Sequence, residues 1–557
     1  MPALRKNPMS AGPWKGVRTT TEPYDDDAAL LLDARNGYIA DPSGLSSFAS
    51  RPGFVLDNGG NAIFTSASAF RGQGIFTHTE LDGTTINFVA MGGHLFRVDG
   101  VLSTFTDVTP GGVTIDADIS TRVAFCDLVG TMVVTDGVNR PWIASNLTST
   151  PITGTYIDYD SLGTSWSAFG APRVYGGSMF FILNQVNGIS RRQDISWCES
   201  GDPSIGYQQT DFDDNWTLIT SSSGALFALW GTNNYLYFFR EASIGTIAGE
   251  VGPTLASTAT EDSIGFNVGA QAWATMTEYG NTLYFCDGLG RPYSVRPGEA
   301  PKAIWLQMRQ IVDESTIAFP AVTARDATGA FESTLNLWLV AIWSPTPSVQ
   351  AAPLELYAWD VRTGTYVGRW DIGDGCSIEC LGSVQDSSGR SVLMMLGSAI
   401  PGGASGYAWS FNSLLGTPEA LTTEGGVLLT TEGGVQLTTE GQDEPWTDNG
   451  SVPTIQAVTN YLGYADDLVW NVDQAVIVTL SDAPCLVSIG TTALATTVEG
   501  TPSPSASQNG TYRLVVGMEA QGRGPSVTIQ PTTATQQWSV QSVSLRGIPS
   551  VADPLDP

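Results

Sequence analysis

Charged side chains are scarce in this chain of 557 residues, at 14% against roughly 25% in an average domain. Basic residues are scarcer still, with 25 Lys and Arg against 55 Asp and Glu and a formal net charge of −30. A nucleic-acid-binding protein needs a basic stripe that neutralises phosphates, so this balance argues against that class. Two interpretations remain. The charge keeps the protein in solution, or it forms a wall that repels polyanions over the roughly 8 Å of a Debye length.

Histidine, the commonest catalytic and metal-binding side chain, is almost missing. The two histidines, His78 and His94, have no His or Cys partner nearby in sequence. We therefore expect them to be hairpin residues rather than members of a Ser-His-Asp or zinc site.

Cysteines and paired acids do not form recognisable metal motifs either. The six cysteines are scattered at Cys126, Cys198, Cys286, Cys376, Cys380 and Cys485, which favours buried, reduced thiols over disulfides or zinc ligands. The acid pairs Asp116/Asp118, Asp158/Asp160 and Asp371/Asp374 lack the twelve-residue calcium loop, so solvated turn acids are expected there. The sequence predicts no enzyme: no catalytic residues, no metal and no cofactor.

Long apolar runs are also absent. No stretch reaches the ~20 apolar residues of a membrane span, and residues 1–12 lack the apolar core of a signal peptide, so we expect synthesis in a cytoplasm. Glycine is abundant instead, at 62 residues, together with 16 Trp. Low charge with many Gly, Thr and aromatic residues favours pleated strands and tight turns over helices.

A β unit recurs along the middle of the chain. Apolar strand-like runs begin near Thr85, Arg122, Arg173, Ala225, Trp273, Leu335 and Ser391. Their spacing of roughly 40 to 60 residues is typical of propeller repeats. We predict an all-β chain with a β-propeller of six or seven blades over residues 54–415.

Different patterns flank the propeller. Residues 1–53 are expected to form an extended N-terminal arm. Residues 452–548 carry six short strand patterns and predict a β-sandwich-like domain, followed by a flexible tail over 549–557. Between the propeller and this domain, residues 416–451 hold an octapeptide that starts at Leu421 and recurs from Leu429 and Leu437. This insert is either a small β-ribbon, which would align Glu424, Glu432 and Glu440 in an acidic row for a partner, or a flexible low-complexity linker.

Three short motifs occur in a particular order within residues 14–245. The first combines Trp14-Lys15-Gly16-Val17-Arg18 with Arg35-Asn36-Gly37-Tyr38 and Arg51-Pro52-Gly53. The second is Trp197-Cys198-Glu199-Ser200-Gly201-Asp202-Pro203, and the third is Phe239-Arg240-Glu241-Ala242-Ser243-Ile244. Their order resembles the tail nozzle, or packaged-DNA stabilisation, proteins of short-tailed bacteriophages, although Cys198 stands where that family more commonly has Ser.

The resemblance implies a structural virion protein made in the host cytoplasm and located in the phage tail. It would form a nozzle or hub ring with itself, as a homohexamer, below the portal and adaptor, and help to retain packaged DNA. DNA would pass through the lumen without specific binding, a role that suits an acidic wall. The adaptor, the portal complex and tail fibres are the implied partners, with Trp14 and Arg18 as candidate contacts. The family supplies structural motif residues and no catalytic ones.

Two other functions fit a propeller. A carbohydrate-binding or carbohydrate-cleaving protein, such as a receptor-binding tail protein, would use exposed aromatics or a carboxylate pair roughly 5 to 10 Å apart. A bacterial surface or secreted propeller is the third possibility, and the lack of a signal peptide counts against it.

Overall fold

The computed structural model describes residues 9–11, 16–17, 30–39, 48–51, 53–66, 71–118, 121–159, 162–206, 216–218, 224–252, 265–266, 268–308, 327–342, 355–372, 376–398, 405–411, 456–459, 468–479, 484–490, 495–504, 512–522, 525–532 and 539–551. Within these ranges the chain is all β. The helical elements there are short 3-10 turns: η1 (Asn58–Gly60), η2 (Trp273–Thr275) and η3 (Trp305–Met308).

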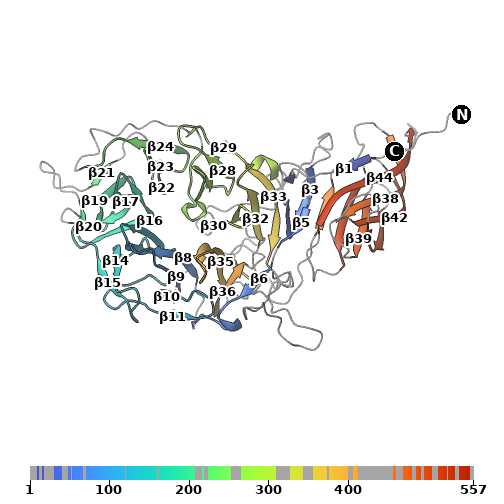
Figure 1. The fold of residues 1–557 in the computed structure, drawn as a ribbon. Helices are drawn as coiled ribbons and strands as arrows, with labels where there is room; N and C mark the ends of the chain where they lie inside the picture. Colours follow the sequence, from blue (N-terminus) through green and yellow to red (C-terminus); the bar gives the residue numbers. More distant parts are fainter. Residues whose placement is uncertain are drawn as a thin grey trace, which may run out of the picture.

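Seven antiparallel sheets of the described residues follow one another as the blades of a β-propeller (Figure 1). Blade one comprises β8 (Gly72–Thr79), β9 (Thr85–Met91), β10 (His94–Val98) and β11 (Phe105–Asp107). Blade two comprises β12 (Ala124–Leu128), β13 (Thr131–Thr135), β14 (Trp142–Ser145) and β15 (Thr153–Tyr156). Blade three comprises β16 (Trp166–Tyr175), β17 (Ser178–Val186), β19 (Asp194–Glu199) and β20 (Asp202–Gly206), with β18 (Ile189–Ser190) and β21 (Trp216–Leu218) beside them.

The remaining four blades repeat the pattern. Blade four comprises β22 (Ala228–Gly231), β23 (Tyr235–Phe239), β24 (Ser243–Ala248) and β25 (Gly265–Phe266), and blade five comprises β26 (Thr277–Tyr279), β27 (Thr282–Cys286), β28 (Pro292–Val295) and β29 (Lys302–Ala303). Blade six comprises β30 (Thr328–Glu332), β31 (Leu337–Ala341), β32 (Glu355–Asp360) and β33 (Thr365–Asp371), and blade seven comprises β34 (Cys380–Gln385), β35 (Ser391–Ser398) and β36 (Ser405–Phe411). Each repeat found in the sequence supplies one blade.

Blade seven is completed by a strand from the other end of the propeller segment. Strand β6 (Phe54–Leu56) pairs with β36, with Phe54 opposite Phe411, and β7 (Phe64–Thr65) pairs further along the same strand. The neighbouring blade one is tied to blade seven by side chains that bond to backbone. The Glu379 carboxylate accepts a hydrogen bond from Gly72 N at 2.6 Å. Strand pairing therefore ties the segment before blade one to blade seven, and a buried polar contact joins the two blades directly.

One expected strand is a turn instead. The sequence predicts that Trp273–Met276 begins blade five as a strand, whereas the structure places η2 there and starts β26 at Thr277. The Thr275 hydroxyl donates to Ala272 O at 2.8 Å and accepts from Cys286 N at 3.0 Å. A Thr side chain that bonds to local backbone competes with strand pairing, and this is why the strand pattern fails here.

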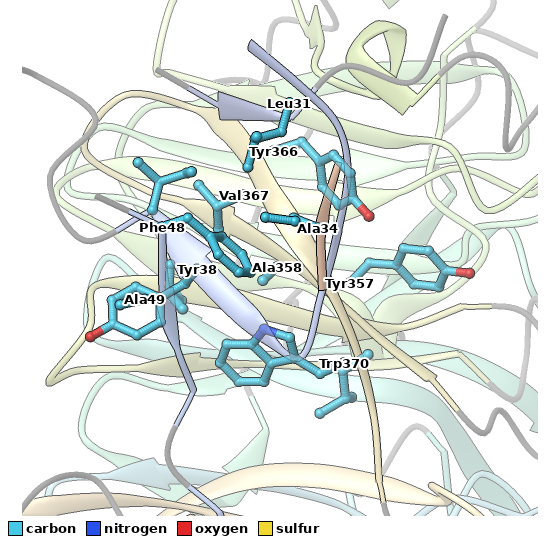
Figure 2. Close-up of a cluster of buried hydrophobic side chains, with 14 of the residues drawn as sticks. Leu31, Ala34, Tyr38, Phe48, Ala49, Tyr357, Ala358, Tyr366, Val367 and Trp370 are labelled. Atoms are coloured by element: carbon cyan, nitrogen blue, oxygen red, sulfur yellow. The ribbon is translucent and has the colours of Figure 1, made fainter. Parts of the chain in front are cut away.

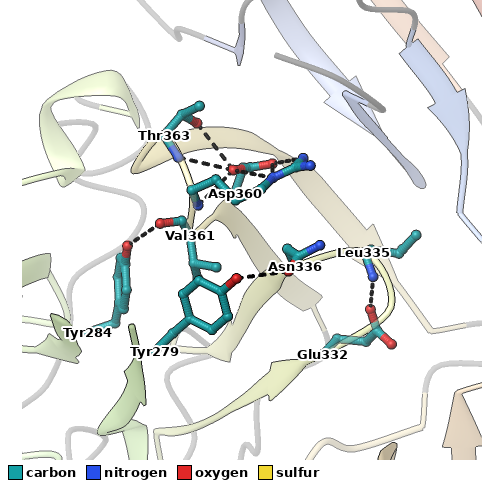
Figure 3. Close-up of polar contacts among 9 residues, drawn as sticks. Tyr279, Tyr284, Glu332, Leu335, Asn336, Asp360, Val361 and Thr363 are labelled. Carbon is teal, nitrogen blue, oxygen red and sulfur yellow. Dashed lines mark hydrogen bonds and ion pairs between the residues drawn. The ribbon is translucent and has the colours of Figure 1, made fainter. Parts of the chain in front are cut away.

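The seams between blades combine aromatic packing with hydroxyl-to-carbonyl bonds. Between blades five and six, Tyr284 Oη donates to Val361 O at 2.7 Å and Tyr279 Oη to Asn336 Oδ1 at 3.2 Å (Figure 3). Close by, Asp360 caps its own turn by accepting from Arg362 N and Thr363 N and pairs with the Arg362 guanidinium. Asp287 and Asp386 repeat this device with Arg291 and Arg390. Part of the acidic balance therefore serves to cap turns.

The C-terminal part is a sandwich of two sheets. One contains β4 (Gly37–Ile39), β5 (Phe48–Ser50), β44 (Ser539–Val551), β38 (Leu468–Thr479), β42 (Tyr512–Gly522) and β41 (Ser503–Pro504), with β1 (Met9–Ala11) on β44; the other contains β2 (Gly16–Val17), β3 (Leu30–Arg35), β37 (Gln456–Thr459), β43 (Ser526–Pro531), β39 (Cys485–Gly490) and β40 (Ala495–Gly500). Side chains of both sheets, such as Ile477 and Val543 with Val487 and Ile529, are buried in one hydrophobic cluster. The expected β-sandwich-like domain is thus observed.

Strands from residues 1–53 belong to both sheets of this sandwich. Strand β3 pairs with β37 on one side and touches β33 of blade six on the other, with Arg35 opposite Arg369, so the propeller and the sandwich share one ten-stranded sheet (Figure 1). Strand β44 continues through Val551, and Pro549 lies opposite Trp470. Residues 549–551 are therefore paired in the sheet, which corrects the expectation of a flexible tail starting at 549.

Five of the six cysteines are buried, and Cys126 is half-buried. Burial raises the pKa of Cys286 well above that of an ordinary thiol, which fits the expected inert, reduced state. In the part of the chain that the structure describes, no helix is long and apolar enough to cross a membrane.

Candidate functional site

Two residues of the first sequence motif, Asn36 and Arg51, meet Trp370 and Asp371 in one buried contact, here called the arm junction. Asn36 Oδ1 accepts from Arg51 Nε at 3.3 Å and from Asp371 N at 2.9 Å. Arg51 Nη2 donates to Asp371 O at 2.8 Å, and Trp370 Nε1 donates to Gly37 O at 2.8 Å. The arm residues thus bond to the last strand of blade six.

The arm junction is enclosed by aromatic side chains. Arg51 is 0% exposed, and its guanidinium lies 5.5 Å from the Phe54 ring centre and 5.8 Å from that of Trp370. Figure 2 shows Trp370 next to Tyr38, Phe48 and Ala49 from β4 and β5. Burial, together with the charge of Glu332, raises the pKa of Tyr38 to about 12, so its hydroxyl stays neutral. The geometry serves to hold the arm in place.

Backbone conformation explains why Asn36 and Gly37 stand at this point. Asn36 has a φ of +53°, a left-handed conformation that Asn tolerates better than most residues. A side chain on Gly37 would place its Cβ 2.2 Å from the Phe48 ring. The Asn36-Gly37 pair therefore forms a kink, at which the chain leaves one sheet of the sandwich at Arg35 and enters the other at Gly37.

The second family motif forms a hairpin in blade three. Trp197 is buried, stacks on Phe180 at 6.0 Å and donates from Nε1 to Gly252 O at 2.9 Å. Gly201 supplies the positive φ of +81° at the turn, and Asp202 Oδ1 accepts from Ser204 N at 2.9 Å. Pro203 O accepts from a Tyr159 hydroxyl at 3.0 Å. These residues shape a turn and its packing.

The third motif is the hairpin between β23 and β24 in blade four. Ile244 is buried opposite Phe239, Ser243 O accepts from Arg240 N at 2.9 Å, and Glu241 is exposed at the tip. The structure therefore brings the arm-motif residues together but keeps the second and third motifs in separate blades. Trp14, Arg18, Pro52, Glu424, Glu432 and Glu440 lie outside the described residues.

The histidines and paired acids are placed as strand and turn residues. His78 is fully buried in β8, with Nδ1 2.7 Å from Asp127 Oδ1, and its Nε2 has no hydrogen-bond partner in the described structure. His94 lies 3.0 Å from Asp107 at the surface. Asp116 accepts from the Thr121 hydroxyl at 2.6 Å and Asp158 pairs with Arg140, while Asp160 and Asp374 lie outside the described residues. No group of three possible metal ligands occurs within the described ranges.

Two neighbouring cavities lie at the centre of the propeller. The mouth cavity, about 290 Å³, is lined by Arg122, Asp136, Phe169, Asn184, Arg192, Gln271 and Trp273, among others. The channel cavity, about 140 Å³, is lined by inner-strand residues that include Phe76, Phe125, Arg173 and Cys380. Both cavities share Arg122, Trp273 and Ala274, so the η2 turn contributes to the lining of each.

Arginines line both cavities: Arg122 and Arg192 in the mouth cavity, and Arg122 and Arg173 in the channel cavity. Arg122 is only 7% exposed, and the charges of Arg71 and Arg122 oppose the burial that raises the pKa of the Cys380 thiol. Burial also lowers the pKa of the Arg173 guanidinium, an effect that the charge of Glu278 opposes. In a chain of net charge −30, such a gathering of arginines creates a local field of opposite sign.

Sequence reasoning missed the mouth cavity. Its lining side chains come from blades two and three and from the segment before β26, separated by up to about 150 residues, and no local motif connects them. The one available signal was Trp273, which sequence analysis assigned to a strand. A strand pattern that the structure replaces with a turn is expected most often at functional or strained positions.

Comparisons with known proteins add little to this geometry. Neither a family model nor a curated protein matches the chain. Among solved structures, it is similar to an exo-beta-1,3-galactanase from Phanerochaete chrysosporium, with 8% identity, coverage of 78% of this chain and 97% of that chain, and a TM-score of 0.25. The Pan2 WD40 domain of Neurospora crassa gives 8% identity, 62% and 90% coverage and a TM-score of 0.36. The AfRom2 CNH domain is 9% identical, with coverage of 63% of this chain and 96% of that chain and a TM-score of 0.33. At these values the similarity carries no argument about function.

Proposed function

We propose that this chain is a structural protein of a phage tail, a nozzle or hub subunit that assembles with copies of itself into a ring. The ring continues the DNA-ejection channel below the portal and adaptor and helps to retain packaged DNA. The observation that carries the proposal is the arm junction. Residues of the family-like arm motif, Asn36 and Arg51, contact each other and blade six, so this part of the resemblance corresponds to a built feature.

The cavities support a lumen between subunits rather than one through each propeller. The channel cavity is about 140 Å³, which is too small for a DNA duplex, whose major groove alone is about 12 Å wide. In the proposed ring, DNA passes between the subunits. A net charge of −30 per subunit suits such a wall, because each neutralised phosphate would add affinity and slow the transit of DNA.

A closed ring requires heterologous contacts, in which each subunit uses two different surfaces. Because β3 joins the sandwich to blade six through one sheet, propeller and sandwich are continuous in the subunit. One of them can contact the adaptor and portal while the other contacts tail fibres. Imaging of the proposed ring therefore has to resolve which of the two parts contacts the adaptor and portal and which contacts the fibres.

Localisation on virions tests the proposal. Gold-labelled antibody against this chain, imaged on particles from a lysate of the source, is expected to mark the tail tip at a single vertex. Antibody against the major capsid protein serves as the control, because it should label the whole shell. Label on peripheral fibres, or particles without label, would contradict the nozzle role.

A further inference from the structure

The mouth cavity contains the elements of a binding site for a small polar ligand. It is about 290 Å³, close to the lower end of the roughly 300–1,000 Å³ found for ligand pockets. Two aromatic residues, Phe169 and Trp273, and two arginines, Arg122 and Arg192, contribute to its wall. Trp273 and Phe169 are half-buried. The Arg192 guanidinium lies over the Phe169 ring, so Trp273 is the ring whose apolar face can stack on a sugar.

Both arginines are positioned by the fold. The Arg192 guanidinium lies 3.3 Å from the Phe169 ring centre and 5.0 Å from that of Phe227, and its Nε and Nη2 donate to Leu226 O at 3.2 and 2.8 Å. Arg122 is more than nine-tenths buried. A guanidinium held by stacking and hydrogen bonds loses little entropy when it meets an anion, and arginine is well suited to carboxylate recognition.

The backbone around the cavity is shaped for close approach. Strand β16 has a register shift between Phe169 and Arg173. Gly170, within it, has a φ of +69°, and a Cβ there would lie 3.6 Å from the Trp273 ring. β-Bulges are over-represented beside binding sites, where they redirect side chains. The bulge of blade three and the η2 turn of blade five together bring Phe169 and Trp273 to the same cavity.

The single carboxylate of the mouth cavity is fully occupied. Asp136 accepts four hydrogen bonds, from Asp116 N at 2.8 Å, Val138 N at 3.0 Å, Asn139 N at 2.7 Å and Asn139 Nδ2 at 2.7 Å. Glycoside cleavage requires two carboxyl groups, and the described lining of this cavity provides one, which caps a turn. The chemistry supports binding rather than cleavage.

We propose that the mouth cavity binds an acidic sugar, a uronic-acid type unit of a polysaccharide, with its carboxylate at Arg122 and Arg192 and its ring against Trp273. In this arrangement the Gln271 amide and the Asn184 Oδ1 meet the sugar hydroxyls, while Asn184 Nδ2 donates to Gly137 O at 2.7 Å. The position of Gln271 is constrained by Gly288, where a Cβ would lie 2.7 Å from the Gln271 amide carbon. This site gives the propeller a receptor-binding role that is separate from ring assembly. A negative result for sugar binding would therefore leave the proposed tail function unaffected, and a negative result for the tail function would leave the sugar site unaffected.

Calorimetry with three probes tests the site: glucuronate, glucose and inorganic phosphate. Glucuronate is expected to bind with a Kd of about 1 mM, a value typical of ligands this small. Glucose lacks the carboxylate and should bind at least about tenfold more weakly, since a charge-assisted hydrogen bond contributes that much or more. No heat from glucuronate, or equal binding of glucose, overturns the proposal. Phosphate binding as tight as glucuronate binding would show an anion site without sugar recognition and would also overturn it.

Variants locate the site. Arg192→Gln should weaken glucuronate binding about tenfold and leave glucose unchanged, whereas Trp273→Ala should weaken both. Arg140→Gln is the matched control, because Arg140 also stacks on an aromatic ring, Tyr156 at 4.4 Å, and pairs with an acid, but it does not line the cavity. Equal losses in the two arginine variants would refute the location. If thermal melting shows that Arg192→Gln does not fold, Gln271→Ala, a smaller change at a half-buried residue, is compared with Arg140→Gln instead.

Discussion

At the scale of single residues, the arm junction shows why a short motif needs its particular side chains. Asn36 combines a positive φ with an amide oxygen that meets both Arg51 and the backbone of Asp371. Gly tolerates this conformation but lacks the acceptor, and Ala lacks both the acceptor and the tolerance. Hydrogen bonding and backbone conformation therefore account for Asn36 in this motif.

Replacing this residue should destabilise the protein. Asn36→Ala is expected to lower the free energy of unfolding by about 2 to 4 kcal/mol more than Asn187→Ala, because it leaves a buried guanidinium and a backbone N–H without their acceptor. Asn187 has a similar φ of +51° but is exposed on a turn, so the strain of Ala at positive φ cancels in the comparison. Urea denaturation measures both variants. Equal losses would show that only backbone strain matters at Asn36.

At the scale of elements, strand β6 closes the propeller and ends at a perturbed carboxyl group. Asp57 is 7% exposed and accepts from the Ser410 hydroxyl at 2.8 Å. Burial raises the pKa of Asp57 to about 8, an effect that the Ser410 hydrogen bond opposes and the charge of Asp99 reinforces. The folded state thus holds a proton on this group that the unfolded chain releases near its ordinary pKa of 3.8.

This pKa predicts a loss of stability with rising pH. Because the folded protein binds the proton more tightly, the closure of β6 onto β36 should weaken progressively between about pH 4 and pH 8 and change little above that. Hydrogen exchange of the β6 and β36 amides follows the closure, after correction for intrinsic exchange rates. Asp57→Asn should remove the dependence, while the exposed turn substitution Asp82→Asn should retain it. A wild-type closure independent of pH would contradict the assignment.

At the scale of the whole molecule, charge governs how subunits meet. Each subunit carries a formal charge of −30, so subunits of the proposed ring repel one another unless salt screens them, over about 8 Å at physiological ionic strength. Raising NaCl from low concentration should therefore increase the ring fraction, measured by mass photometry at fixed protein concentration. A ring that dissociates as salt rises would indicate an interface of ion pairs and contradict this expectation.

The sequence by itself determined the all-β class, the repeating blades and the sandwich. These follow from local patterns: strand periodicity, Gly-rich turns and a repeat spacing that reflects one blade at a time. The turn at Thr275 escaped prediction because it depends on a hydroxyl that bonds to Ala272 and Cys286.

Tertiary structure alone decided where distant residues meet. It placed β3 between blade six and the sandwich, brought Arg51 to Asp371 across 320 positions, and gathered Arg122, Arg192 and Trp273 around one cavity. The physical reason is that closing a ring and burying an arm set long-range contacts through packing and hydrogen bonding between blades. Sequence patterns, which record only which face of each strand is apolar, do not encode these contacts.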